Sequence, residues 1–261
     1  MTYPDILKLK ENLIFDTHAH YDDIRFDGIR DDLLPELNKN GVGRIITCAV
    51  DDSSAKKSLA LADKYDFVYA AVGIHPENLE SGTKVEEIKN LASHKKCVAI
   101  GEIGLDYYYT QDNKQEQKEV FINQVILANE LNLPVIVHDR EAHGDTLEIL
   151  KKYKPKGVLH CFSGSEEMAK EIVKLGMYIG VGGSVTFKNA RKLPDTIKAI
   201  PINRLLLETD CPYLCPEPFR GKLCHSGYIT LTAGKIAEIL GIPRDRVLEQ
   251  TYKNAQELFS L

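Results

Sequence analysis

Eight short apolar runs recur along the chain, and they constrain its fold more than any other feature. They are LIFDT, RIITCAV, FVYAAVGI, CVAIGEIG, LPVIVHD, GVLHCFS, MYIGVGG and RLLLETD, which begin at residues 13, 44, 67, 97, 133, 157, 177 and 204. Each is apolar without strict alternation, which is typical of parallel strands buried on both faces. Between them, residues 31–41, 53–66 and 115–132 carry apolar side chains at helical spacing. We expect the second of these helices to begin on serine caps and the first to close on Gly41.

This alternation of strand and helix predicts an α/β fold, a (β/α)8 TIM-type barrel, formed as a single domain by residues 1–261. An open doubly wound sheet is the alternative. Two more helical patterns follow the last strand, at residues 229–241 and 244–259. We expect them to pack on the outside of the barrel and not to form a second domain.

Composition places the chain among ordinary globular proteins. Hydrophobic residues make up 43% and charged residues 27%. The N-terminal segment has no apolar core of signal-peptide length, and no stretch approaches the ~20 apolar residues that span a bilayer. We therefore expect a cytoplasmic protein with no membrane partner and with its six cysteines reduced and mostly buried. The group Cys211, Cys215, Cys224 and His225 indicates a structural zinc site only weakly, because its first gap is longer than CxxC.

The net charge of −5 argues against a broad basic surface that binds any nucleic acid. It does not exclude nucleic acid as a substrate, because bound metal ions supply local positive charge that a count of side chains omits.

Metal-ligand side chains follow or end most of the expected strands. His18 and His20 lie two apart in FDTHAH, so in an extended chain they share a face. Each such residue has a simpler explanation when taken alone; a histidine before a proline, for example, shapes a turn. Because barrel active sites are built at the C-terminal ends of the strands, we expect the whole set to converge. The set comprises His18, His20, His75, Glu102, His138, His160 and Asp210.

Four histidines and two carboxylates exceed the needs of one tetrahedral zinc, so we predict two divalent ions, with magnesium, manganese and zinc all admissible. Glu102 is the predicted bridge and, with Asp210, a predicted catalytic residue. Asp210 would join the first metal or orient the attacking water and accept its proton. The ligands would divide into His18 with His20 and His138 with His160. GxSxG is absent, and GEIG lacks the continuation of a dinucleotide-binding loop.

The motifs resemble those of the TatD-type metal-dependent deoxyribonucleases, over almost the whole chain. DTHAHYD, GIHPE, IGEIGLDYYY, LPVIVHDREAHGDT, GVLHCFSG and LLETDCPYL occur in the family's order. The resemblance implies a TIM-type barrel and hydrolysis of DNA phosphodiester bonds, often from the 3′ end, with magnesium, manganese or zinc. It also implies that the metals are held by the residues matching His18, His20, Glu102, His138, His160 and Asp210.

One segment departs from the family's pattern. After the last strand the family commonly has GKRNEP followed by a tyrosine, whereas this chain has RGKLCHSGYI from Arg220 to Ile229. Cys224 and His225 stand in that region, so we expect the loop to recognise a different substrate and take His225 as a candidate substrate-binding residue.

Three further candidates for substrate binding follow strands. His75 and Arg140 would hold phosphate, the arginine through its bidentate fork, although Arg140 would equally pair with Glu141. Tyr107, with the two tyrosines after it, would offer a stacking face for a base, or else an apolar plug at the barrel rim.

The sequence thus predicts a metal-dependent DNase of the TatD type, acting as a 3′–5′ exonuclease on single-stranded or frayed ends, with DNA as substrate and no obligate protein partner. An amidohydrolase or lactonase would suit the same barrel but often bridges its metals with a modified lysine, and neither strand four nor strand five offers one. A D-aminoacyl-tRNA deacylase and a catalytically silent metal-binding scaffold are two further possibilities.

Overall fold

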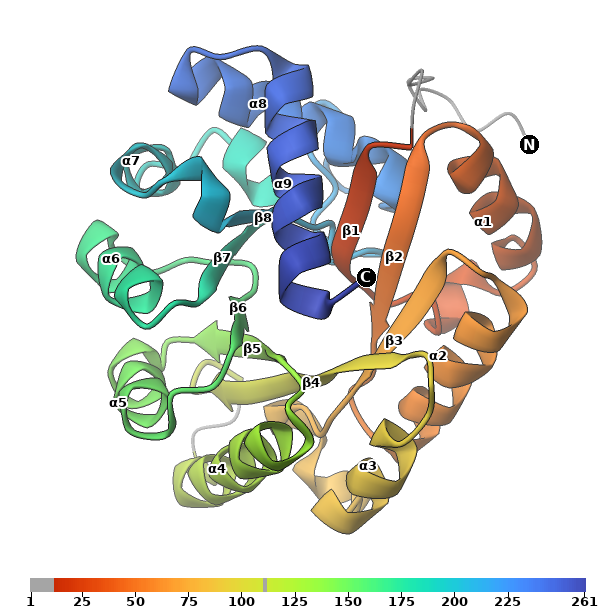
Figure 1. Ribbon diagram of the computed structural model, residues 1–261, viewed down its shortest axis with the longest axis vertical. Helices are drawn as coiled ribbons and strands as arrows, with labels where there is room; N and C mark the ends of the chain where they lie inside the picture. The colour runs from red at the N-terminus through yellow and green to blue at the C-terminus, as the bar shows by residue number, and fades with distance from the viewer. Residues whose placement is uncertain (1–11, 110–111) are drawn as a thin grey trace.

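The computed structural model describes residues 12–109 and 112–261, and its strands form one sheet in the order β1 to β8. Each neighbouring pair from β1–β2 to β7–β8 is parallel. This sequential order confirms the barrel and excludes the doubly wound sheet, whose strand order reverses. The strands lie in a ring (Figure 1). Their bounds are Ile14–Ala19, Val42–Cys48, Val68–Val72, Cys97–Asp106, Val135–Arg140, Gly157–Leu159, Tyr178–Val181 and Leu205–Leu207.

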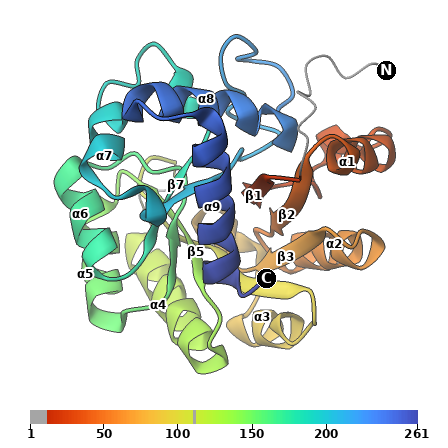
Figure 2. The same cartoon turned by 45° about the horizontal axis from the view of Figure 1, so that its top comes forward.

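Helices surround the ring, and α1 to α7 lie outside the strands (Figure 2). The α-helices α1 to α9 span Arg30–Lys39, Asp52–Lys64, Val85–Ala92, Lys114–Leu131, His143–Tyr153, Glu166–Lys174, Leu193–Ala199, Ile229–Leu240 and Arg244–Phe259. Short 3-10 helices η1 to η5 span Ile24–Phe26, Pro76–Ser81, Gly183–Thr186, Ile202–Arg204 and Ser226–Tyr228.

Of the two predicted helix ends, the start of α2 differs from the prediction and the end of α1 agrees with it. The serine caps predicted for α2 are wrong, because Asp51 caps it by accepting a hydrogen bond from the backbone N–H of Ser54 at 2.8 Å. A carboxylate also suits the positive end of the helix dipole. The first helix ends at Lys39, and Gly41 follows with a φ of 116°, as a chain reversal favours.

The barrel closes between the C-terminal end of β1 and the residues that follow β8. The backbone N–H of Asp210 donates to the carbonyl of His18 at 2.9 Å, and that of His20 donates to Cys211 at 2.7 Å. Ala19 and Cys211 form an isolated parallel bridge. Two predicted metal-ligand segments are thus held together by the backbone contacts that close the fold.

Helix α9 departs from the expected position, because its C-terminal end joins the core inside the barrel. Phe259 and Ala255 pack in a buried cluster with side chains from the strands, including Phe15, Ile46 and Leu206. The rings of Phe15 and Phe259 lie 6.0 Å apart. In Figure 1, α9 lies in front of the ring beside β8 and β1. The expectation that both last helices pack only on the outside is therefore wrong for α9.

All six cysteines are free thiols, and five are buried, while Cys161 is half-buried. No helix in the described part of the chain is long and apolar enough to cross a membrane. The N-terminal segment on which the expectation about a signal peptide rests lies largely outside the described residues.

Candidate metal centre

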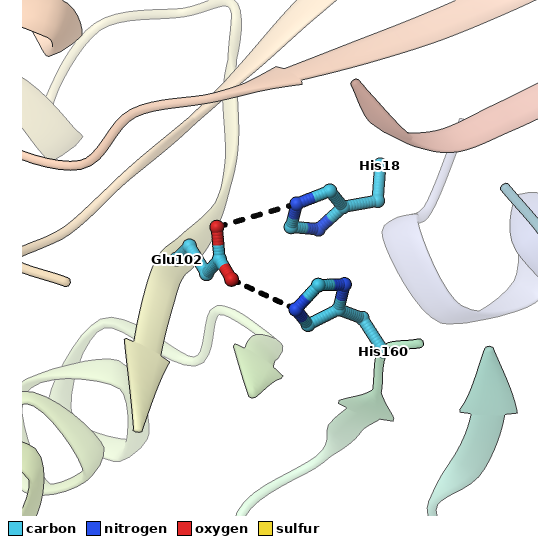
Figure 3. Close-up of side chains that lie close together, drawn as sticks. All are labelled: His18, Glu102 and His160. Carbon is cyan, nitrogen blue, oxygen red and sulfur yellow. Dashed lines mark ion pairs between the residues drawn. The ribbon is translucent and has the colours of Figure 1, made fainter. Parts of the chain in front are cut away.

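The fold brings all six predicted metal ligands together at the C-terminal ends of the strands. His18 lies in β1 and Glu102 in β4, while His160 directly follows β6. Figure 3 shows His18 and His160 facing opposite oxygens of the Glu102 carboxylate. Glu102 is only 3% exposed. The remaining three are His20 after β1, His138 in β5 and Asp210 after β8.

One oxygen of Glu102 faces the two histidines of the DTHAH motif. Oε2 lies 3.3 Å from His18 Nε2 and 3.5 Å from His20 Nε2. Asp210 approaches the same two nitrogens, with Oδ1 at 3.3 Å from His20 and 3.6 Å from His18. These side chains form one compact donor group.

The other oxygen of Glu102 faces a different set of histidines. Oε1 lies 2.8 Å from His160 Nε2, 3.0 Å from His138 Nδ1 and 3.4 Å from His75 Nε2. The division follows the grouping that the sequence predicts, with His75 added. His18 also touches this side, because its ring stacks on that of His160 at 3.8 Å.

Strand β4 runs close to β5 just beyond Glu102. The pairing of the two strands shifts register between Ile100 and Ile103. At Gly104, φ is 145°, and a Cβ would collide with the carbonyl oxygen of His138. Only glycine tolerates that approach. The second glycine of GEIG, Gly104, therefore allows β4 and β5 to pack closely.

Hydrogen bonds behind the histidines fix which ring nitrogens face inward. His20 Nδ1 lies 2.8 Å from the carbonyl of Cys48, and His138 Nε2 lies 3.0 Å from Asp106 Oδ2. A carbonyl and a carboxylate only accept, so these outer nitrogens carry protons, and the inward nitrogens would be left to ligate a bound cation. Sequence reasoning missed Asp106, although its position four residues after Glu102 in the same strand was a usable indication.

The donor set fits divalent cations. His18 Nε2 and His20 Nε2 lie 3.1 Å apart, and His138 Nδ1 lies 3.4 Å from His160 Nε2. Nitrogens held this close, with a carboxylate between the pairs, are placed to share a proton or to ligate a cation. Several clusters of three such donors have all their ligand atoms within 4.8 Å of one another, including His18 with Glu102 and His160. Nitrogen and oxygen donors together suit zinc and manganese in particular.

The pKa values of the buried groups also show that the centre attracts positive charge. Burial alone would raise the pKa of Glu102, but His160, His75 and His18 hold it well below its usual range. Burial alone would lower the pKa of His138, but Asp106 and Glu102 raise it to about 10. The carboxylates are thus ionised and draw positive charge into a buried site.

Glu208 is a second buried carboxyl group that sequence reasoning missed. Its side chain is completely buried, and Oε1 accepts a hydrogen bond from the backbone N–H of Cys161 at 2.5 Å. Oε1 also lies 3.9 Å from His160 Nδ1. Burial raises the pKa of Glu208 to about 8. It packs behind His160, two residues before Asp210 in the LETD sequence.

Comparison with known proteins identifies the family of this chain. The family model for TatD related DNase matches residues 15–260. The chain belongs to the TatD-related DNase family. The uncharacterized metal-dependent hydrolase YabD of Bacillus subtilis is 41% identical, with 95% of this chain and all of that protein covered. YcfH of Escherichia coli, named in the same way, is 37% identical, with 95% and 96% covered.

A solved structure agrees with the fold. The crystal structure of YJJV, a TatD homolog from Escherichia coli, superposes with a TM-score of 0.89 at 34% identity, covering 96% of this chain and 99% of that one. YabD and YcfH are both named metal-dependent hydrolases, in keeping with the donor set described above.

The segment that departs from the TatD pattern lies in the loop after β8, residues 211–225, which we call the β8 loop, and in η5. His225 is only 5% exposed; its Nδ1 accepts from the N–H of Gly227 at 3.2 Å, and its ring stacks on Tyr228 at 4.1 Å. Burial and the capping of η5 leave little of the His225 ring open to a substrate.

Ser226 anchors the end of this loop to β1. Its hydroxyl donates to Asp16 Oδ2 at 2.7 Å, and its N–H donates to the hydroxyl of Tyr21 at 3.0 Å. Asp16 also accepts from the hydroxyl of Thr209 at 2.7 Å. This buried network holds the β8 loop beside the metal-ligand segments of β1.

The remaining substrate-binding candidates differ in exposure. The guanidinium of Arg140 lies over the rings of Tyr108 and Tyr109, at 4.3 and 4.6 Å. Those two rings are exposed, whereas Tyr107 is buried and its hydroxyl donates to Asp145 at 2.7 Å. Of the three tyrosines, Tyr107 is therefore enclosed, whereas Tyr108 and Tyr109 remain open to solvent.

His75 lies deeper than a rim phosphate site would require. It is 7% exposed, and its Nδ1 accepts from the N–H of Glu77 at 3.2 Å, capping η2. Its other nitrogen reaches Glu102, as described above. The residue therefore shapes the turn and also belongs to the candidate metal centre.

The cysteine site considered from the sequence gains no support. The clustered donor groups found in the described residues do not include Cys211, Cys215, Cys224 or His225. Cys215 and Cys224 are hydrogen-bonded to each other instead.

Acid stability gives a test of the role of His225. Burial lowers its pKa to about 4, from 6.5, so the unfolded chain binds the proton first. Stability should fall as pH drops from about 6.5 towards 4. His225→Asn keeps a capping acceptor but does not titrate, so between about pH 7.5 and pH 5 it should lose about 2 kcal/mol less unfolding free energy than the parent. Urea unfolding of both proteins in EDTA measures this.

The control is His143, whose pKa is raised by its hydrogen bond with Asp139. His143→Gln should change the acid profile in the opposite direction, because it removes a group that stabilises the folded state when protonated. Parallel profiles for His225→Asn and the parent would contradict the assignment of His225 as a buried neutral cap.

Proposed function

We propose that this protein is a divalent-metal-dependent hydrolase that cleaves phosphodiester bonds of DNA, as a 3′–5′ exonuclease on single-stranded or frayed ends. One observation carries the proposal: the two oxygens of the buried Glu102 carboxylate face two separate groups of histidine nitrogens. A carboxylate with both oxygens committed in this way suits two cations that share it.

The residues divide into two shells under this proposal. His18, His20 and Asp210 would hold one ion, His138 and His160 the other, and Glu102 both. When bound, such ions supply an activated water at neutral pH and positive charge opposite a phosphate group. Asp106 keeps the lone pair of His138 directed inward, and the carbonyl of Cys48 does the same for His20.

Asp210 is the carboxylate that we assign to proton transfer. Its side chain is 19% exposed, against 4% for Glu102, so water reaches it more readily. Burial alone would raise its pKa, but the hydrogen bond with His20 and the neighbouring histidines keep it below the usual value. Asp210 is therefore ionised at neutral pH and able to accept the proton of an attacking water.

The preference for strand ends follows from charge and shape. A protein of net charge −5 offers few contacts to phosphates along a duplex. The centre lies at the mouth of a barrel, ringed by the loops that follow the strands, which admits one or two nucleotides more readily than an intact helix. The family description supports DNA as the substrate.

The bridging role of Glu102 predicts the metal content of a variant. Glu102→Gln removes the charge that both shells share, so the purified protein should hold less than one ion where the parent holds two. Glu167→Gln, an exposed change on α6, is the matched control and should keep both. Metal analysis after dialysis measures the content, and retention of two ions by Glu102→Gln would refute the bridge.

A change at Asp210 should affect hydrolysis much more than metal content. Asp210→Asn keeps an oxygen donor and the size of the side chain but cannot accept a proton, so hydrolysis should fall by at least about 10²-fold. Metal content should change much less. Turnover equal to that of the parent would reassign Asp210 to a structural role.

The proposed reaction is tested with end-labelled and circular single strands. With manganese or magnesium, a 5′-labelled linear strand should shorten stepwise from its 3′ end, while closed circles stay intact. Asp210→Asn, purified in the same way, controls for contaminating nuclease. Efficient cutting of circles with linear ends untouched would refute the exonuclease.

A further inference from the structure

A pocket of about 500 Å³ lies between η1 and the β8 loop, beside the metal centre. Its lining includes three cationic side chains, Arg25, Arg220 and Lys222, and the rings of Tyr213 and Phe187. The volume lies within the range of roughly 300 to 1,000 Å³ typical of small-ligand sites. The cavity therefore has room for a nucleotide.

The three cations of this pocket differ in whether they form ion pairs. Arg25 forms a bidentate pair with Asp23, with its shortest contact at 2.8 Å. The ion pairs of the described part of the chain include neither Arg220 nor Lys222. The guanidinium of Arg220 instead lies 4.3 Å from the ring of Phe187, which orients it. In an acidic protein, two uncompensated cations lining one cavity favour an anionic ligand.

Tyr213 links this pocket to the metal centre. It follows Asp210 by three residues, and its ring lies edge-on to that of His20, with centroids 6.4 Å apart. Arg25 covers one side of the ring at 4.0 Å, yet 47% of the residue remains exposed. Leu223, 36% exposed, adds apolar surface to the lining. Cations beside an open aromatic face are the elements that bind single strands.

The pocket is held in shape by the chain itself. The N–H of Cys224 donates to the carbonyl of Pro212 at 3.1 Å and closes the base of the loop. The N–H of Glu217 donates to the hydroxyl of Thr186 at 2.8 Å, which ties the loop to η3. Because the loop is already ordered, a ligand that binds in this pocket would cost the protein little conformational entropy.

We propose that this pocket is the subsite for the nucleotide next to the bond being cleaved, with its phosphate at Arg220 and Lys222 and its base against Tyr213. The inference rests on the proposed function, because it takes the substrate to be a single nucleic acid strand that continues from the metal centre. It assigns a role to Arg220 and Lys222, which come just before the residues that depart from the family pattern.

The test is binding of a fluorescein-labelled dT12 strand, followed by anisotropy in EDTA so that nothing is cleaved. Arg220→Gln/Lys222→Gln should weaken binding on the order of tenfold at low salt. It should also reduce the slope of log affinity against log salt by about 1.4, the value for two lost phosphate contacts to a single strand. Lys95→Gln/Lys253→Gln, an equal charge change at exposed sites away from the pocket, should leave both unchanged.

Tyr213 separates stacking from charge. Tyr213→Leu should weaken dT12 binding on the order of tenfold with the salt slope unchanged, while Tyr213→Phe should bind like the parent. Lys95→Gln/Lys253→Gln should also leave hydrolysis of bis(p-nitrophenyl) phosphate, which has no neighbouring nucleotide, unchanged. Melting temperatures near that of the parent would show that the folds are intact.

The outcomes distinguish this subsite from the proposed function. Absence of dT12 binding by the parent, or affinity and salt slope unchanged in Arg220→Gln/Lys222→Gln, would overturn the subsite even if DNA is cleaved. Weakened binding in that variant, with no DNA cleavage by the parent under any metal, would keep the subsite and refute the nuclease.

Discussion

The buried carboxylate of Glu102 is the group on which the arrangement of this site depends. An ionised group at 3% exposure is costly unless positive charge or hydrogen-bond donors surround it. Here five histidines from four regions of the chain supply those neighbours, and the carboxylate in turn keeps their nitrogens together. Neither partner would be stable in the interior alone. That mutual dependence explains why residues from β1, β4, β5 and β6 meet within a few ångströms.

A second constraint couples this centre to the closure of the barrel. Asp210 and His20 take part both in the donor group and in the backbone contacts between β8 and β1. Behind them, Asp16 accepts from Thr209 and Ser226 in a completely buried network. Movement between β8 and β1 would therefore displace the predicted metal-ligand residues and the β8 loop together. The proposed nucleotide subsite inherits its position from the same contacts.

Much of this was accessible from the sequence because it depends on order along the chain. Eight apolar runs separated by helical segments are enough to predict parallel strands, and strands in a barrel place their C-terminal residues at one end. His18, Glu102 and His160 could be assigned to one centre on that basis. Asp106 was within reach too, because it lies four residues after Glu102 in the same strand. Glu208 could not be assigned, because what distinguishes it is the atoms that it touches. Sequence position gave no means of telling such a carboxyl group from a surface acid.

The sequence by itself determined the fold class, the end of the barrel that carries the site and the six residues that converge there, since these follow from local periodicity and strand direction. Tertiary structure decided which oxygen of Glu102 meets which histidine, His75 included. It also decided that His225 and Tyr107 are enclosed, while Arg220, Lys222 and Tyr213 share a pocket. Exposure and neighbourhood depend on how distant segments pack, and no local pattern encodes that packing.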